Sequence, residues 1–238
     1  MKKLLLFYCL LFHILCATEF HYSIASPHFE LAYTEKDHAV SGELLEAAEV
    51  VYPQLCKDFQ HTFSKKIHIT LYPTIASHHQ ATGLHDAPEW VVARTKNGVI
   101  DIVSPLNPGP HHSKQTTKNI LLLNIAKAFI HDKFAGASLP LWLVFGAASV
   151  KVGYPFSKLP QVLPSWEELE TSDYKKFGFV RGYQCAHSFV SFLEKKYGWE
   201  TVLRLLAEYT AFEKITGLSQ KELYAQWMKI TLIYGPIE

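Results

Sequence analysis

The chain has 238 residues, 48% of them hydrophobic, and its 23 Lys and Arg nearly balance its 22 Asp and Glu. A chain of this length can bury a sizeable core, and because no Gly-, Pro- or Ser-rich linker divides it, we expect one domain. The near-neutral charge argues against nucleic acid or an anionic membrane surface as a partner.

The N-terminus has the pattern of a secretory signal peptide. Lys2 and Lys3 precede an apolar run from Leu4 to Leu15, and small residues follow it. We therefore predict a signal peptide at 1–17 and a single domain at 18–238, exported to the periplasm of a bacterial-type cell or secreted. An uncleaved anchor is the alternative, although the run is shorter than the roughly 20 residues that a bilayer requires. No later segment has 18 uninterrupted apolar residues, so we expect no membrane span in the mature chain.

The first half of the predicted domain has the pattern of a small mixed sheet. Alternating or β-branched apolar runs predict strands at 28–34, 67–72, 90–93 and 99–103. Apolar residues at helical spacing predict a helix over 41–63. Asn97-Gly98, between the last two strands, is typical of a hairpin turn.

The second half is predicted to be helical. Residues 120–130 are apolar nearly all round, which indicates a helix in the middle of the protein, and Pro140 begins a second apolar helix over 139–152. Further helices are predicted at 177–197, 200–212 and 219–230. Ser219 and Glu222 form a capping box at the start of the last one. We therefore expect an α+β fold, with a small N-terminal mixed sheet and hairpin followed by a helical C-terminal half.

Two cysteines, Cys56 and Cys185, lie in the predicted mature chain. An exported location would permit a disulfide between them, and two buried free thiols are the alternative. The sequence leaves both open.

Two apolar segments share a pattern with a known family. Residues 121–131 read LLLNIAKAFIH and residues 139–153 read LPLWLVFGAASVKVG. They resemble the two active-site helices of the peptidase MA-like family, gluzincin-type zinc metallopeptidases, which carry HExxH on the first helix and a phrase of the type LPxWLxEGxA on the second. A looser likeness extends from about Ser26 to Ile230. The resemblance implies a zincin-like fold.

The positions that carry chemistry in this family differ here. The resemblance places Asn124 and Ala128 at the two histidines, Ile125 at the catalytic glutamate and Phe145 at the downstream glutamate. In an HExxH helix, two histidines on one face hold zinc and the glutamate takes a proton from the metal-bound water. Asparagine is a poor zinc ligand, and the other three side chains have no donor atom. We therefore predict no catalytic residue, no metal site at these positions and no cofactor, although the family would hold zinc there.

These observations favour an exported, inactive peptidase homologue that binds a peptide or an envelope protein through a retained cleft. In peptidases of this class, the substrate lies extended along an edge strand above the active-site helix. We expect the strand at 99–103 to provide this edge and Ile125 and Phe145 to lie at an apolar floor. The predicted cleft residues are Val99, Ile100, Asp101 and Trp142.

Two other functions stay open at this stage. A working metallohydrolase would need ligands from unexpected places, and the sequence offers His78, His79, His111 and His112. Solvated surface histidines are the simpler interpretation, because these have no HxxxH spacing and no Cys partner. The second alternative is a structural protein of the cell envelope.

Overall fold

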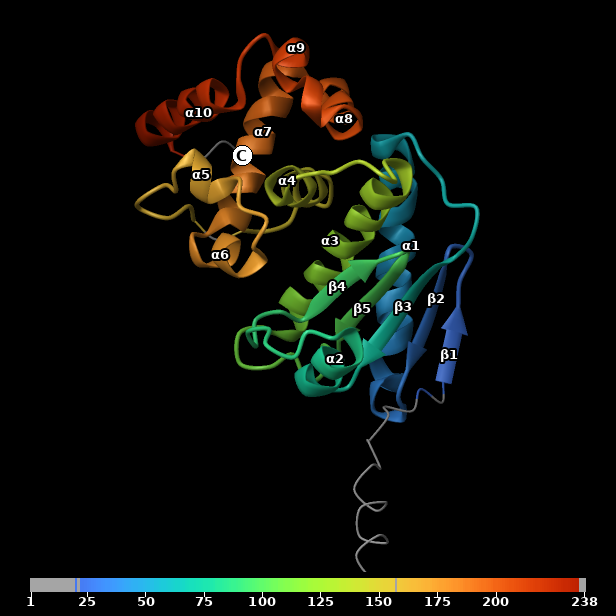
Figure 1. Cartoon of the computed structure of the whole chain (residues 1–238). Helices are drawn as coiled ribbons and strands as arrows, with labels where there is room; N and C mark the ends of the chain where they lie inside the picture. The colour runs from blue at the N-terminus through green and yellow to red at the C-terminus, as the bar shows by residue number, and fades with distance from the viewer. Residues whose placement is uncertain (1–19, 21, 157, 236–238) are drawn as a thin grey trace, which may run out of the picture.

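The fold combines one mixed sheet with helices that dominate the C-terminal half (Figure 1). The computed structural model describes residues 20, 22–156 and 158–235. The predicted signal peptide at 1–17 lies outside these residues. The expected order, an N-terminal mixed sheet with a hairpin before a mainly helical half, is confirmed.

Five strands form the sheet in the order β1-β2-β3-β5-β4. They are Tyr22–Ala25 (β1), Phe29–Tyr33 (β2), Ile67–Tyr72 (β3), Ala93–Lys96 (β4) and Val99–Val103 (β5). β3 pairs in parallel with β2 and β5, whereas the outer pairs, β1 with β2 and β4 with β5, are antiparallel. β4 is therefore an edge strand, and β5 is paired on both sides.

The hairpin between β4 and β5 turns at Asn97-Gly98 as predicted. Both residues have positive φ angles, 52° and 75°, which asparagine and glycine tolerate best. Because this turn has only two residues, Lys96 pairs directly with Val99. The first strand of the hairpin consequently lies at 93–96 and not at the predicted 90–93.

Helices cover both faces of the sheet (Figure 1). A short 3-10 helix, Glu35–Asp37 (η1), leads into His38–Phe59 (α1), which packs with Lys114–Lys133 (α3) on one face, while Ile75–Thr82 (α2) lies on the other. A capping box between Ser113 and Thr116 begins α3 six residues before the predicted helix.

The remaining helices form a group in which α4 lies next to α3 and the others lie beyond α4 (Figure 1). They are Leu141–Lys151 (α4), Trp166–Leu169 (α5), Tyr174–Phe179 (α6), Gly182–Tyr197 (α7), Trp199–Ala207 (α8), Tyr209–Ala211 (3-10 helix η2), Phe212–Thr216 (α9) and Gln220–Tyr234 (α10). Ser219 and Glu222 form the predicted capping box. The single helix expected over 177–197 is divided, because Arg181 adopts a left-handed conformation with φ 59°.

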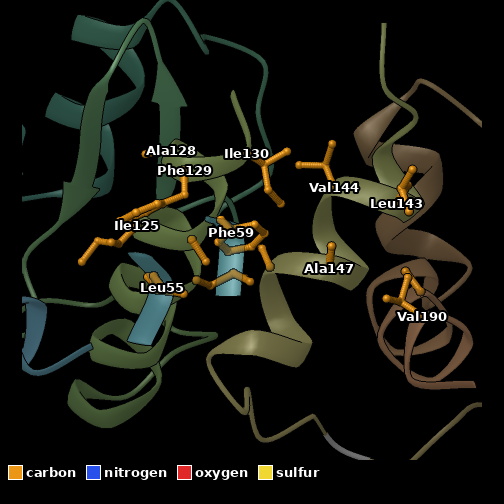
Figure 2. Close-up of a cluster of buried hydrophobic side chains, with 14 of the residues drawn as sticks. Leu55, Phe59, Ile125, Ala128, Phe129, Ile130, Leu143, Val144, Ala147 and Val190 are labelled. Atoms are coloured by element: carbon orange, nitrogen blue, oxygen red, sulfur yellow. The ribbon is translucent and has the colours of Figure 1, made fainter. Parts of the chain in front are cut away.

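One cluster of buried side chains joins the sheet side to the C-terminal helices. Figure 2 shows part of it, where Leu55 and Phe59 of α1 lie near Ile125 and Phe129 of α3. The cluster continues through α4 to Val190 of α7 (Figure 2). This packing fixes α3 between the sheet and α4.

Candidate ligand-binding cleft

A cavity of about 410 Å³ lies beside the edge strand. Its walls include Thr95 of β4, Asn124 and Lys127 of α3, Phe145 of α4 and Tyr183 of α7. No Asp or Glu is among the residues that line it. We call this cavity the β4–α3 cleft.

The free edge of β4 provides main-chain hydrogen-bonding groups along the cleft. Val103 N–H donates to the Val92 carbonyl (2.9 Å). This bond shows which residue pairs of the antiparallel ladder are hydrogen-bonded to each other. Because alternate residues of such a ladder point their main-chain groups to opposite sides, the N–H and C=O groups of Ala93 and Thr95 point away from β5. In the described part of the chain, no strand pairs with this side of β4.

A chain of hydrogen bonds connects β4 to the α3 side of the cleft. Thr95 Oγ1 donates to Asn124 Oδ1 (2.9 Å), and Lys127 Nζ donates to the same oxygen (3.1 Å). Asn124 Nδ2 in turn donates to the Ile120 carbonyl (2.8 Å). The Asn124 amide is therefore satisfied at both ends, although the side chain is 3% exposed.

Lys127 is the buried cation of the cleft. Its Nζ lies 4.4 Å from the centre of the Phe145 ring, a cation–π distance, and the residue is 9% exposed. Burial lowers the pKa of Lys127 from 10.5 to about 8. The side chain therefore still carries its proton for most of the time at neutral pH.

Aromatic rings form an apolar wall of the cleft. Phe145 meets Tyr183 edge to face, with 4.8 Å between ring centres, and Trp90 lies 6.2 Å from Tyr183 and 6.3 Å from Tyr174. Burial raises the pKa of Tyr183, so its hydroxyl stays neutral. An occupant of the cleft would thus meet aromatic rings as well as strand β4.

The four positions that the resemblance assigns to zinc chemistry divide into two groups. Asn124 and Phe145 line the cleft, whereas Ile125 and Ala128 are 0% and 2% exposed and belong to the core (Figure 2). A zinc ion at Asn124 would compete with the Thr95 and Lys127 donors for one amide oxygen and would face the Lys127 ammonium. The residues present do not fit the family's metal.

None of the four predicted cleft residues lines this cleft. Trp142 is fully buried and packs on Trp166 and Phe189, with ring centres 5.7 and 5.1 Å away. Ile100 is also fully buried.

Val99 and Asp101 alternate with Ile100 and therefore lie on the opposite face of the sheet. Asp101 pairs across the ladder with Arg94 and accepts a hydrogen bond from the Tyr72 hydroxyl (3.3 Å). Burial raises the pKa of its carboxyl, against the lowering effect of Arg94. The expectation that 99–103 forms the edge is wrong, since β5 has a strand on each side.

Two of the histidines considered as metal ligands contact main-chain carbonyls. His79 and His112 each contact a main-chain carbonyl, Val91 at 2.7 Å and Trp90 at 2.9 Å. His111 is exposed, whereas His78 is fully buried, so the interpretation of all these side chains as surface residues is wrong for His78 and His79. Within the described residues, no three His, Cys, Asp or Glu side chains are grouped to hold a metal ion.

Cys56 and Cys185 are both free thiols in the structure, with no disulfide between them. Cys185 is fully buried, and burial raises the pKa of its thiol to about 12. Neither cysteine lines the β4–α3 cleft.

Sequence reasoning missed Lys127, although a signal for it existed. It is the only charged residue in the apolar stretch 120–130, and a lysine in a buried helix needs an explanation. Thr95 and Tyr183 had no comparable signal, because their place in the cleft depends on strand register and on the packing of α7.

Comparisons with known proteins leave the family open. No model of a known protein family matches the chain, and no curated protein matches its sequence. Among the described residues, no helix has both the length and the apolar character needed to cross a membrane.

Proposed function

We propose that this chain is an exported, non-catalytic homologue of gluzincin-type zinc metallopeptidases, with a zincin-like fold, that binds extended polypeptide segments in the β4–α3 cleft. The observation that carries the proposal is the unpaired edge of β4 beside a cavity lined by rings. An extended segment could add to this edge as a further strand, because main-chain pairing requires no metal.

The side chains at the site do not provide the groups that a metallohydrolase needs. A peptide laid along β4 would meet Asn124, Lys127 and Phe145, where a hydrolase needs metal ligands and a general base. Asn124 cannot act as that base, and the Lys127 amine is mostly protonated at neutral pH. The cleft is therefore suited to hold a segment and not to cut it.

Peptide capture tests the binding part of the proposal. The probe is a pool of random heptapeptides built from Ala, Leu, Ser, Thr, Tyr and Val, acetylated at the N-terminus and amidated at the C-terminus. We expect the immobilised protein to enrich a subset of this pool over immobilised serum albumin, as read by mass spectrometry. The absence of any enrichment would refute the proposed binding function.

Two substitutions of Thr95 locate the binding at the edge strand. Thr95→Pro removes an outward N–H that serves no ladder hydrogen bond, whereas Thr95→Val removes only the hydroxyl. We expect Thr95→Pro to weaken capture by about fivefold relative to Thr95→Val, the effect of one lost hydrogen bond. Equal capture by two folded variants, with folding checked by circular dichroism, would place the binding elsewhere.

The same pool tests the absence of catalysis. After incubation with stoichiometric zinc chloride, we expect every peptide to remain intact. Cleavage that a chelator stops, and that Asn124→Ala abolishes, would show a working hydrolase and overturn this part of the proposal.

A further inference from the structure

The Lys127 ammonium has donor capacity that the fold does not use. An ammonium has three N–H donors, and the described contacts of Nζ are one hydrogen bond to Asn124 and one ring face, Phe145. No acidic side chain lines the cleft, and burial is the one cause of the lowered pKa of Lys127, without a contribution from a neighbouring carboxylate. Among the described residues, the charge is thus buried without a counter-ion.

A buried charge of this kind is costly unless a ligand supplies its partner. Charged groups in protein interiors are normally paired, because moving an unpaired charge out of water costs a large amount of folding free energy. Surface lysines of the same helix do have such partners, since Lys114 and Lys118 both form ion pairs with Glu43 of α1. Lys127 faces the cleft, where an occupant can reach it.

We propose that the Lys127 ammonium receives a carboxylate of the bound polypeptide segment, either its C-terminal carboxylate or an Asp or Glu side chain. This inference rests on the proposed function, because it names the group that the β4–α3 cleft recognises. A carboxylate supplies the missing negative charge and accepts the unused N–H groups. The cleft thereby selects acidic or chain-terminal segments among those that can pair with β4.

The position of Lys127 relative to β4 suits this role. Thr95, whose main chain forms part of the free edge, and Lys127 donate to the same Asn124 oxygen. A segment paired with β4 at Thr95 therefore passes close to the ammonium. The Phe145 ring covers one side of Nζ, with 4.4 Å to the ring centre.

Three forms of the heptapeptide pool test the inference. The first has a free C-terminal carboxylate, the second a C-terminal amide, and the third an amide with one Asp or Glu at a random position. We expect wild-type protein to capture the first or the third form about tenfold better than the second, as one charge-assisted hydrogen bond in a buried site would give. Which of the two is preferred distinguishes a chain terminus from an acidic side chain.

Lys127→Met and Lys118→Met form a matched pair of variants. Both remove one positive charge from α3, but Lys118 Nζ pairs with Glu43 outside the cleft. We expect Lys127→Met to abolish the preference for carboxylate, so that the variant captures the carboxylate and amide forms equally well. Lys118→Met should keep the wild-type preference.

The outcomes separate this inference from the proposed function. Equal capture of all three forms, unaffected by Lys127→Met, would overturn the role of Lys127 and leave peptide binding intact. No capture of any form would overturn both. Dodecanoate, a carboxylate without peptide groups, provides the last arm: if it binds in a Lys127-dependent manner while no peptide does, the occupant is an acyl chain and both statements are wrong.

Discussion

Lys127 is a residue whose charge opposes the stability of the fold that contains it. Burial lowers its pKa from 10.5 to about 8, so the folded protein holds the proton less tightly than the unfolded chain does. Below pH 8 both states are protonated and the folded state bears the full cost of the buried charge. As the pH rises from 8 to 10.5, the folded state loses its proton first and this cost disappears.

Removal of the Lys127 charge should therefore stabilise the free protein. We expect Lys127→Met to raise the free energy of unfolding by about 1–3 kcal/mol at pH 7, with a gain that declines towards pH 10.5. Urea unfolding at pH 7 and pH 10 measures both values. Lys118→Met is the control and should change stability by less than about 1 kcal/mol. A loss of stability in Lys127→Met at pH 7 would mean that the ammonium has a partner within the fold.

At the scale of elements, α4 and α7 pack so closely that one contact leaves room only for glycine. A Cβ built on Gly146 of α4 would meet Val190 Cγ2 and would lie 2.6 Å from the Ala186 carbonyl oxygen of α7. The second of these is a main-chain atom, which cannot rotate away. The orientation of α4, and with it the position of Phe145 in the cleft, depends on this contact.

Two glycine-to-alanine substitutions separate the effect of this packing on stability from the effect of helix propensity. Gly146→Ala should lower the free energy of unfolding by about 1–3 kcal/mol, because it overfills the α4–α7 contact. Gly42→Ala is the matched control: Gly42 is exposed in α1, and an added Cβ would meet nothing within 4 Å. It should stabilise by about 0.5–1 kcal/mol, the difference in helix propensity. Thermal unfolding of both variants measures the effects, and a neutral Gly146→Ala would show that the contact is looser than described.

The whole molecule shows which parts of a fold the sequence can predict. Strong periodicity predicted α1, β3 and β5 closely, an apolar run predicted the middle of α3, and the Asn97-Gly98 turn predicted the hairpin, because these signals are local. β1 and the short helices α2, α5 and α9 were not predicted, since they carry few apolar residues at regular spacing.

The cleft was predicted less well, for a physical reason. β4 begins three residues later than predicted, which changes the residues that form the free edge. The internal position of β5 depends on strand order, which is a long-range property of the fold. Phe145 was expected at the floor of the cleft and lines it, whereas Ile125, expected there too, belongs to the core. Asn124, which the resemblance places at a zinc-ligand position, also lines the cleft. Trp142 was not distinguishable from a cleft residue by sequence, because an apolar helix such as α4 has no face that local spacing marks as exposed.

Acid stability of the whole protein should depend on His78, a fully buried histidine of α2. Neither ring nitrogen has a hydrogen-bond partner of good geometry, and the ring lies edge to face with Tyr72, 5.5 Å between centres. Burial, with smaller contributions from His79 and Arg94, lowers the pKa of His78 from 6.5 to about 4, although the Asp101 main chain favours the proton slightly.

Because its folded pKa lies below its unfolded pKa, His78 contributes stability that is present above pH 6.5 and is lost as the pH falls towards 4. We expect His78→Leu to reduce the loss of stability between pH 6.5 and pH 4 by up to about 3 kcal/mol relative to wild type. Urea unfolding at both pH values gives the difference, and His111→Leu, which changes an exposed histidine, should leave the wild-type pH dependence in place. An equal acid loss in His78→Leu and wild type would assign the sensitivity to other groups.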